Sequence, residues 1–283
     1  MPSGKRARQQ RQEAAKTPPP VRSKGGTSGQ RKASPKALGI AGGIVLVIVI
    51  VIVLAVVLAS GSSGGSNTNT GALPTTGNST GPAALPGAQE ANALFKGIPQ
   101  EGLVLGNPAA PVTMEMFIDV QCPICQRYEV DSLPTIVKKY IRSGKVQLHL
   151  QPWAFIGPDS RSGRLALIAA SFQNKGFEYA KVLYDNQPPN SENTGWLNDS
   201  MMGQIAASVD GLNVDKVLSQ KGDSGAADIA SKVDQLAHAA NVQGTPTVLV
   251  GKTGGKLHDI MPPGYAPTLQ ITQQALDAAL ANQ

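Results

Sequence analysis

Apolar and polar residues follow two different rhythms along this chain from about residue 93 onward. Short β-branched runs and period-two alternation predict strands at 103–105, 112–118, 146–150, 247–250 and 256–260. Helical spacing predicts helices at 128–143 (kinked near Pro134), 165–174, 177–186, 201–208, 214–220, 225–241 and 269–281. This order predicts an α/β domain at residues 93–283, with a helical insertion at about 160–241.

Two segments near the N-terminus differ from the folded region in composition. Residues 1–36 carry ten Lys and Arg against one acid, a net charge of +9, so a whole-chain charge of +6 leaves −3 for the rest. This composition predicts a disordered tail, and the basic charge is therefore no sign of nucleic-acid binding. Residues 60–92 are rich in Gly, Ser, Thr and Pro, which predicts a flexible linker.

Between these segments, residues 37–59 contain an uncharged apolar run from Leu38 to Ala59. As a helix, that run would span roughly 33 Å, enough to cross a bilayer. Its positive N-terminal flank predicts a single-pass cell-membrane protein with a cytoplasmic N-terminus and an extracytoplasmic domain. A signal peptide cleaved after Ala59 is the alternative, although its apolar region is usually only about 7–15 residues long.

The two cysteines of the chain, Cys122 and Cys125, lie where the strand at 112–118 gives way to a helix. A cysteine at a helix N-terminus is stabilised as a thiolate by free backbone N–H groups and the helix dipole. Pro123 suits the first helical turn, where its missing N–H matters least. The spacing places both sulfurs on one face and permits a reversible disulfide. The pattern therefore predicts a dithiol redox site, which needs no cofactor.

Two other interpretations of the cysteine pair are weaker. A zinc site needs about four ligands, but no second cysteine pair exists and His149, His238 and His258 are widely separated. A purely structural disulfide would close a very short loop and would restrict the unfolded chain little. The dithiol redox site remains the preferred interpretation.

Three motifs resemble the DsbA-like form of the thioredoxin fold: residues 106–112 (GNPAAPV), 117–125 (FIDVQCPIC) and 244–247 (GTPT). The resemblance implies a thioredoxin fold with an inserted helical domain. It implies that Cys122 is the nucleophilic, more exposed sulfur and Cys125 the buried resolving one. It also implies that Pro246 is cis and turns the backbone of Thr245 toward the sulfurs. The alternative for Pro246 is an ordinary trans proline before a strand.

At two positions this chain departs from many DsbA-like relatives. Ile124 stands where many have a histidine that helps to stabilise the thiolate, which implies a less oxidising couple than the strongest members have. Met116 stands where many have a buried glutamate. Glu115 is adjacent, but neighbouring strand residues point to opposite faces, so the group that exchanges protons with Cys125 is left open.

The resemblance implies an extracytoplasmic thiol–disulfide oxidoreductase that oxidises cysteine pairs of secreted or membrane proteins through Cys122 and Cys125. It also implies re-oxidation by a quinone-linked membrane partner. Two alternatives stay open. One is a disulfide reductase or isomerase with the same fold, favoured by Ile124. The other is a non-catalytic thioredoxin-like binding module, which the intact cysteines and the Thr245-Pro246 pair argue against.

Overall fold

The computed structural model describes residues 73–262 and 264–282. The predicted tail (1–36), the predicted membrane helix (37–59) and the first part of the predicted linker (60–72) lie outside the described residues. Among the residues that are described, no helix is both long and apolar enough to span a bilayer.

A six-stranded mixed sheet forms the centre of the domain, with the strand order β1-β2-β4-β3-β5-β6. The three long strands are β3 (Val112–Ile118), its parallel neighbour β4 (Val146–Pro152) and its antiparallel neighbour β5 (Thr247–Lys252). Three two-residue strands complete the edges: β1 (Gln100–Glu101), β2 (Val104–Leu105) and β6 (His258–Asp259). Because β3 is paired on both sides, the position where it ends is firmly fixed.

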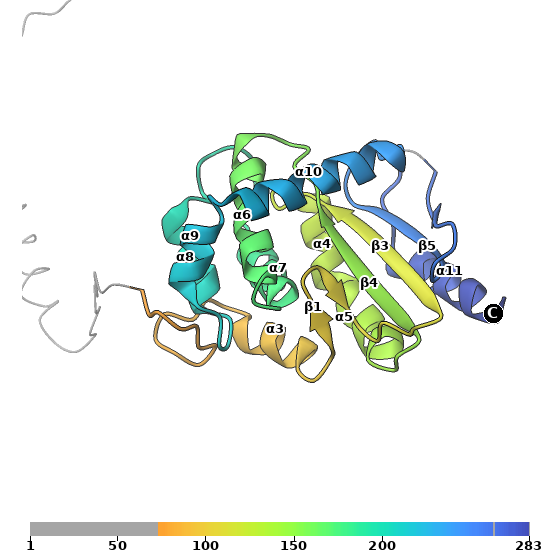
Figure 1. Cartoon of the computed structure of the whole chain (residues 1–283), viewed down its shortest axis with the longest axis horizontal. Helices are drawn as coiled ribbons and strands as arrows, with labels where there is room; N and C mark the ends of the chain where they lie inside the picture. Colours follow the sequence, from red (N-terminus) through yellow and green to blue (C-terminus); the bar gives the residue numbers. More distant parts are fainter. Residues whose placement is uncertain (1–72, 263, 283) are drawn as a thin grey trace, which may run out of the picture. The chain divides into compact units, whose positions relative to one another are not determined.

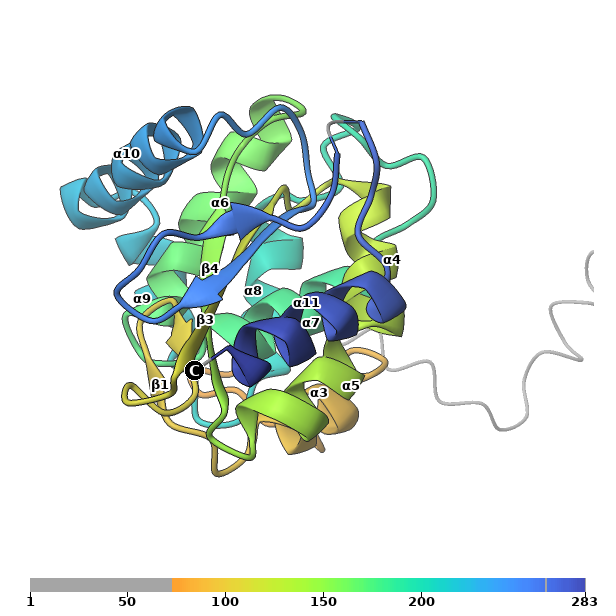
Figure 2. The ribbon, with the colours of Figure 1, turned by 90° about the vertical axis from the view of Figure 1, so that its right-hand side faces the viewer.

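Helices cover both faces of the sheet (Figure 2). The crossover from β3 to β4 consists of α4 (Pro123–Asp131), α5 (Leu133–Ile136) and a π-helical turn (Val137–Ile141). These elements share one face with α11 (Leu269–Ala281), and α10 (Ser224–Ala239) lies on the other. The predicted helix at 128–143 begins earlier, at Pro123, and its expected interruption is confirmed at Ser132. Pro134 lacks the N–H that would continue the helical hydrogen bonds.

The alternation of side chains along β3 divides the core in two. Met116 and Ile118 pack in the large core that also contains Cys125. Phe117 points the other way and packs with Ala237 of α10. Neighbouring strand residues therefore face different helices, as the pleat of a strand requires.

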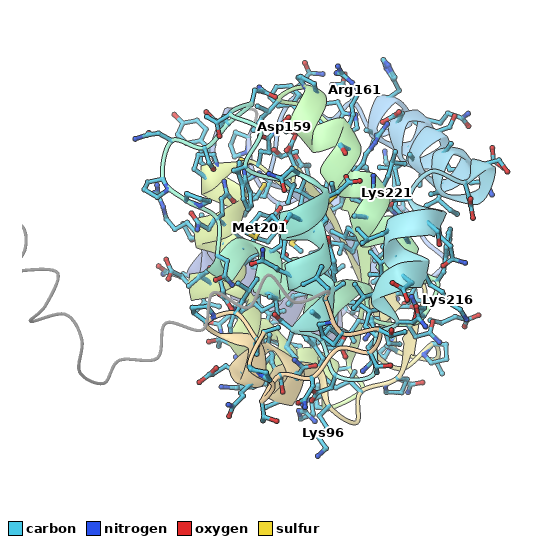
Figure 3. All side chains as sticks on the ribbon, turned by 90° about the vertical axis from the view of Figure 1, so that its left-hand side faces the viewer. Lys96, Asp159, Arg161, Met201, Lys216 and Lys221 are labelled. Atoms are coloured by element: carbon cyan, nitrogen blue, oxygen red, sulfur yellow. The ribbon has the colours of Figure 1, made fainter. Side chains whose placement is uncertain are left out.

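The predicted insertion at 160–241 corresponds to five helices between β4 and β5 (Figure 1). They are α6 (Pro158–Ser171), α7 (Gly176–Asp185), α8 (Asp199–Ala207), α9 (Val214–Gln220) and α10. Figure 3 shows their outer face, where Lys216 and Lys221 lie at the surface. Lys221 forms an ion pair with Asp199 at 3.1 Å.

The N-terminal boundary of the folded domain differs from the prediction. Residues 73–87, which we call the N-terminal strap, lie along the insertion, and α3 (Ala88–Phe95) follows them. Gly77 N donates to Leu212 O at 2.8 Å, and Thr76 forms a β-bridge with Asn213. The prediction of a flexible linker at 60–92 is therefore wrong for residues 73–92. The predicted domain start at residue 93 is too late, because the described fold includes residue 73 onward. Small and polar residues indicated flexibility, but their backbone groups are held by hydrogen bonds that require no apolar side chain.

Candidate redox site

Cys122 and Cys125 lie at the N-terminus of α4, directly after the central strand. Cys122 is the N-cap residue, and its Sγ accepts a hydrogen bond from Cys125 N at 3.4 Å, with Pro123 in the first turn. Cys122 retains 6% exposure and Cys125 none, and both are free thiols. The structure therefore agrees with the expected difference in accessibility between the two sulfurs.

The loop before β5 lies against Cys122. The bond between Thr245 and Pro246 is cis, as the resemblance implies. Because β5 pairs with β3, this loop is carried to the end of the sheet where α4 begins. Cys122 Sγ donates a hydrogen bond to Thr245 O at 3.4 Å. Ile124, the remaining predicted site residue, is 42% exposed beside the same loop.

The two sulfurs differ in acidity. The pKa of Cys122 is lowered to about 6, and the largest cause is a hydrogen bond from the Cys125 thiol. Burial opposes this effect, while Thr245 and backbone N–H groups add to it. Complete burial, followed by the neighbouring Cys122 sulfur, raises the pKa of Cys125 well above its usual value. At neutral pH the pair is therefore one thiolate, at Cys122, and one buried thiol.

The carboxylate of Asp119 fixes the approach to the cysteines. This side chain is 1% exposed and lies three residues before Cys122. Its Oδ1 accepts from Gln121 N (2.8 Å) and Ser160 Oγ (2.7 Å). Its Oδ2 accepts from the backbone N–H groups of Phe155 (2.7 Å) and Ile156 (2.8 Å). All four acceptor positions of the carboxylate are thus occupied.

Further hydrogen bonds join the redox segment to α7 and the loop after it. Tyr184 Oη donates to Asp119 O at 2.8 Å, and Gln187 Nε2 donates to Gln121 O at 2.5 Å. Gln126 Nε2 donates to the carbonyl groups of Tyr184 (2.8 Å) and Gln187 (3.0 Å). We call this set the insertion side of the site: Asp119, Gln121, Gln126, Ser160, Tyr184 and Gln187. Sequence reasoning missed the whole set, for which the only local signal was an aspartate at the end of a strand.

The opposite side of the cysteines is open. A groove of about 190 Å³ is lined by Ile124 and parts of two segments. The groove side of the site comprises Ile124, residues 243–247, residues 259–262 and residues 264–267. Tyr265 is 70% exposed at its wall. Apart from Asp259, its lining carries no charged side chain.

Met116 is completely buried. This strand position therefore holds an apolar side chain and no acid. Glu115 shares the strand face of Phe117, away from Cys125, and accepts a hydrogen bond from Gln151 Nε2 at 2.7 Å. Glu115 therefore does not replace the missing acid. In the described ranges, 73–262 and 264–282, no group of three or more His, Cys, Asp or Glu could hold a metal ion.

A thiolate at a helix N-terminus, a buried partner thiol and an adjacent cis-proline loop on this sheet define a thioredoxin-fold thiol–disulfide oxidoreductase. The comparisons with known proteins agree. The chain belongs to the thioredoxin family: residues 99–259 match the sequence model described as "Thioredoxin".

Two relatives from Bacillus species show the nature of this similarity. The chain is 33% identical over 152 residues to "Probable disulfide bond formation protein D" of Bacillus cereus, covering 52% of this chain and 68% of that protein. It is 28% identical over 149 residues to "Disulfide bond formation protein D" of Bacillus subtilis, covering 52% and 66%.

Solved structures share the fold. Oxidised BdbD from Bacillus subtilis gives a TM-score of 0.55 at 24% identity, covering 65% of this chain and 97% of that chain. DsbA from Chlamydia trachomatis gives 0.55 at 18% identity, covering 64% and 92%.

Proposed function

We propose that this protein introduces disulfides into cysteine pairs of secreted or membrane proteins. A substrate thiolate attacks Cys122 Sγ of the Cys122–Cys125 disulfide, and a mixed disulfide forms while Cys125 leaves with the electron pair. A second substrate thiolate attacks the substrate sulfur of the mixed disulfide and releases Cys122 as a thiolate. The substrate is oxidised by two electrons, and the enzyme is left reduced.

The acidity of Cys122 carries the proposed direction. A thiolate that is stable at neutral pH favours the reduced form of the couple, so the disulfide form is an oxidant. The pKa of about 6 is reached although Ile124 supplies no positive charge and no hydrogen bond of its own side chain. Since the stabilisation comes from the Cys125 thiol, Thr245 and backbone groups alone, we expect an oxidant weaker than the strongest members of the family.

The groove side offers a place for the substrate chain. An extended peptide can pair with backbone groups next to a cis-proline in the manner of an added strand, while its neighbouring side chains occupy the groove. Thr245 O already lies 3.4 Å from Cys122 Sγ, so a substrate bound along this loop would bring its cysteine to the reactive sulfur.

We further propose that the domain lies outside the cytoplasm on a membrane anchor at residues 37–59, with re-oxidation by a quinone-linked membrane partner. The uncharged run with its basic flank supports the anchor. The names of the Bacillus relatives, which describe disulfide bond formation, support an oxidising compartment where disulfides persist.

A disulfide reductase or isomerase is the second candidate, and one observation favours it. Ile124 is an apolar, 42% exposed side chain at the position between the cysteines where many relatives have histidine. Without that group, the thiolate loses one source of stabilisation and the couple shifts toward reduction.

The reduction potential of the Cys122–Cys125 couple tests the direction. The purified full-length protein is equilibrated with glutathione buffers, and the fraction reduced is measured by thiol labelling. We expect a value on the DsbA side of the range, toward about −120 mV, whereas a value near about −270 mV would assign a reductase. A Cys122→Ser variant should lose all turnover, and the absence of any reversible couple in the wild type would leave only a binding module.

A further inference from the structure

Cys125 presents a chemical problem that Cys122 does not. Its side chain is completely buried, and burial raises the pKa of its thiol well above the usual value. When the disulfide is attacked at Cys122, the electron pair of the S–S bond passes to Cys125 Sγ. A thiolate without solvent is strongly disfavoured, so a proton must reach this sulfur from a group inside the protein.

Four acids lie in the segment from β3 to α4, which contains the cysteines: Glu115, Asp119, Glu129 and Asp131. Asp131 is exposed, and two of the other three do not fit. Glu115 is on the face of the sheet opposite α4. Asp119 accepts two hydrogen bonds at each carboxylate oxygen, which leaves no free position for a proton. Glu129 is the third.

Glu129 is placed on the same helix as Cys125. It is 1% exposed and follows Cys125 by four residues within α4. Residues at this spacing lie about 5–6 Å apart at Cβ on one face of a helix. Side chains on a helix lean toward its N-terminus, so the common helical rotamers of Glu129 direct its carboxyl group toward the turn that contains Cys125.

The groups that face Glu129 come mainly from α7. Lys181 forms an ion pair with Asp185 one turn along that helix. Lys181 favours the carboxylate of Glu129 and Asp185 opposes it, but burial is the largest cause and raises the pKa of Glu129 to about 8. Tyr184, on the same face of α7, interacts electrostatically with both Glu129 and Cys125. Tyr128, beside Glu129 on α4, also interacts with its charge. Glu129 and Cys125 are both buried and share Tyr184 as a neighbour.

We propose that Glu129 is the acid–base group of Cys125. On opening of the disulfide, the carboxylic acid of Glu129 gives its proton to Cys125 Sγ, which becomes a thiol, and Glu129 becomes a carboxylate beside Lys181. Glu129 then regains a proton from solvent. On closing, Glu129 as the carboxylate takes the proton from Cys125, whose sulfur attacks the mixed disulfide at Cys122.

The role of Glu129 rests on the redox chemistry of the cysteine pair but on neither direction of electron flow. It assigns to the active-site helix the function that an acid at the position of Met116 would serve from the strand. The charged side chains around the Glu129 carboxyl group come from α7, which belongs to the insertion.

The rate at which dithiothreitol reduces the wild-type disulfide tests this role. The rate constant, divided by the thiolate fraction of the reductant, is measured across pH 5–10 with the full-length protein. We expect a fall as pH rises through about 8, where Glu129 loses its proton. In Glu129→Gln the corrected rate should be at least about tenfold lower at pH 6–7 and should show no such fall.

Glu178→Gln is the matched control. Glu178 is a 4% exposed glutamate of α7 that pairs with Lys175 at 3.2 Å and belongs to a different cluster. It should keep the wild-type profile. A Glu129→Gln protein that is folded and keeps both the rate and the pH profile of the wild type would overturn the proposal.

A second variant decides the matter if Glu129→Gln does not fold. Lys181→Met removes the cation that lowers the pKa of Glu129, so the fall in rate should move to higher pH, and an unmoved fall would contradict the role of Glu129. A wild-type protein without any reversible couple would instead overturn the redox function itself, together with this role.

Discussion

The two sides of the redox motif differ in the chemical groups that surround the cysteines. On the insertion side, buried polar side chains bind the segment at 119–126 through hydrogen bonds that reach α6, α7 and the loop after α7. On the groove side, Cys122 meets one backbone carbonyl, Thr245 O, and a largely uncharged surface with exposed Ile124 and Tyr265.

This difference indicates that the insertion side holds the sulfurs in position and that the groove side contacts the substrate. Buried hydrogen bonds rigidify a structure, because each broken bond leaves a desolvated group. A groove with apolar walls and backbone groups accepts many sequences. Changes on the insertion side should therefore alter stability and the sulfurs together, whereas changes on the groove side away from Thr245, which contacts Cys122, should alter substrate binding alone.

The largest effect should follow from Asp119→Ala. This change leaves three backbone N–H groups and the Ser160 hydroxyl without their acceptor in a buried position. We expect a loss of more than about 3 kcal/mol in the free energy of unfolding, measured by urea denaturation. Asp159→Ala is the control: its carboxylate accepts one hydrogen bond, from Gly195 N at 2.7 Å, and its loss should matter far less. Equal losses in the two variants would show that the four hydrogen bonds to the Asp119 carboxylate do not stabilise the fold more than a single exposed one does.

The pH dependence of stability should differ between the reduced and oxidised proteins. The pKa of Cys122 is about 6 when folded, below its usual value of 9.0, so its thiolate stabilises the reduced fold. That contribution is lost as pH falls through about 6 and grows as pH rises toward 9. The unfolding midpoint of the reduced protein should therefore rise relative to the oxidised protein across this window.

A change at Thr245, on the groove side, gives a second test of the stabilised Cys122 thiolate. Thr245→Val removes a hydroxyl that lowers the pKa of both cysteines, so the pKa of Cys122 should rise, as followed by thiolate absorbance. The pH window in which the reduced protein gains stability should narrow accordingly. A relative midpoint that does not change with pH in the wild type would contradict a stabilised thiolate.

The smallest effect should follow from Tyr265→Ala. Tyr265 is 70% exposed at the wall of the groove, so its truncation removes little packing from the fold. We expect KM for a dithiol peptide to rise by about threefold, or about 0.6 kcal/mol, with the pKa of Cys122 unchanged. A shift in that pKa would show that the outer wall of the groove, and not only Thr245, affects the sulfurs.

Elements fixed by local sequence were predicted well. β3, α9 and α11 have the predicted ends. A mostly apolar run marks the strand, and Asn213 and Thr268 cap the two helices through their side chains. By contrast, no strand was predicted at β1, which contains two residues and exists because β2 pairs with it. No alternation is visible in two residues.

Prediction of the site residues has the same limit, because it depends on what is local in the sequence. Cys122, Cys125 and Pro246 were predicted because each belongs to a short motif whose chemistry is local. The partners of Asp119 were not, because its donors in other elements lie between 36 and 65 positions away along the chain. Glu129 is local in sequence, but its burial depends on α7, which only the folded structure brings against α4.

The N-terminal strap determines where this protein can be cut. Leu85 N donates to Ser208 Oγ at 2.9 Å, and Gly203, which has no side chain, leaves room for Leu73. A recombinant fragment that started at residue 93, where the apolar rhythm begins, would sever α3 and uncover the helices that surround Tyr184. The smallest piece that reproduces the redox behaviour of the whole chain should begin no later than Leu73.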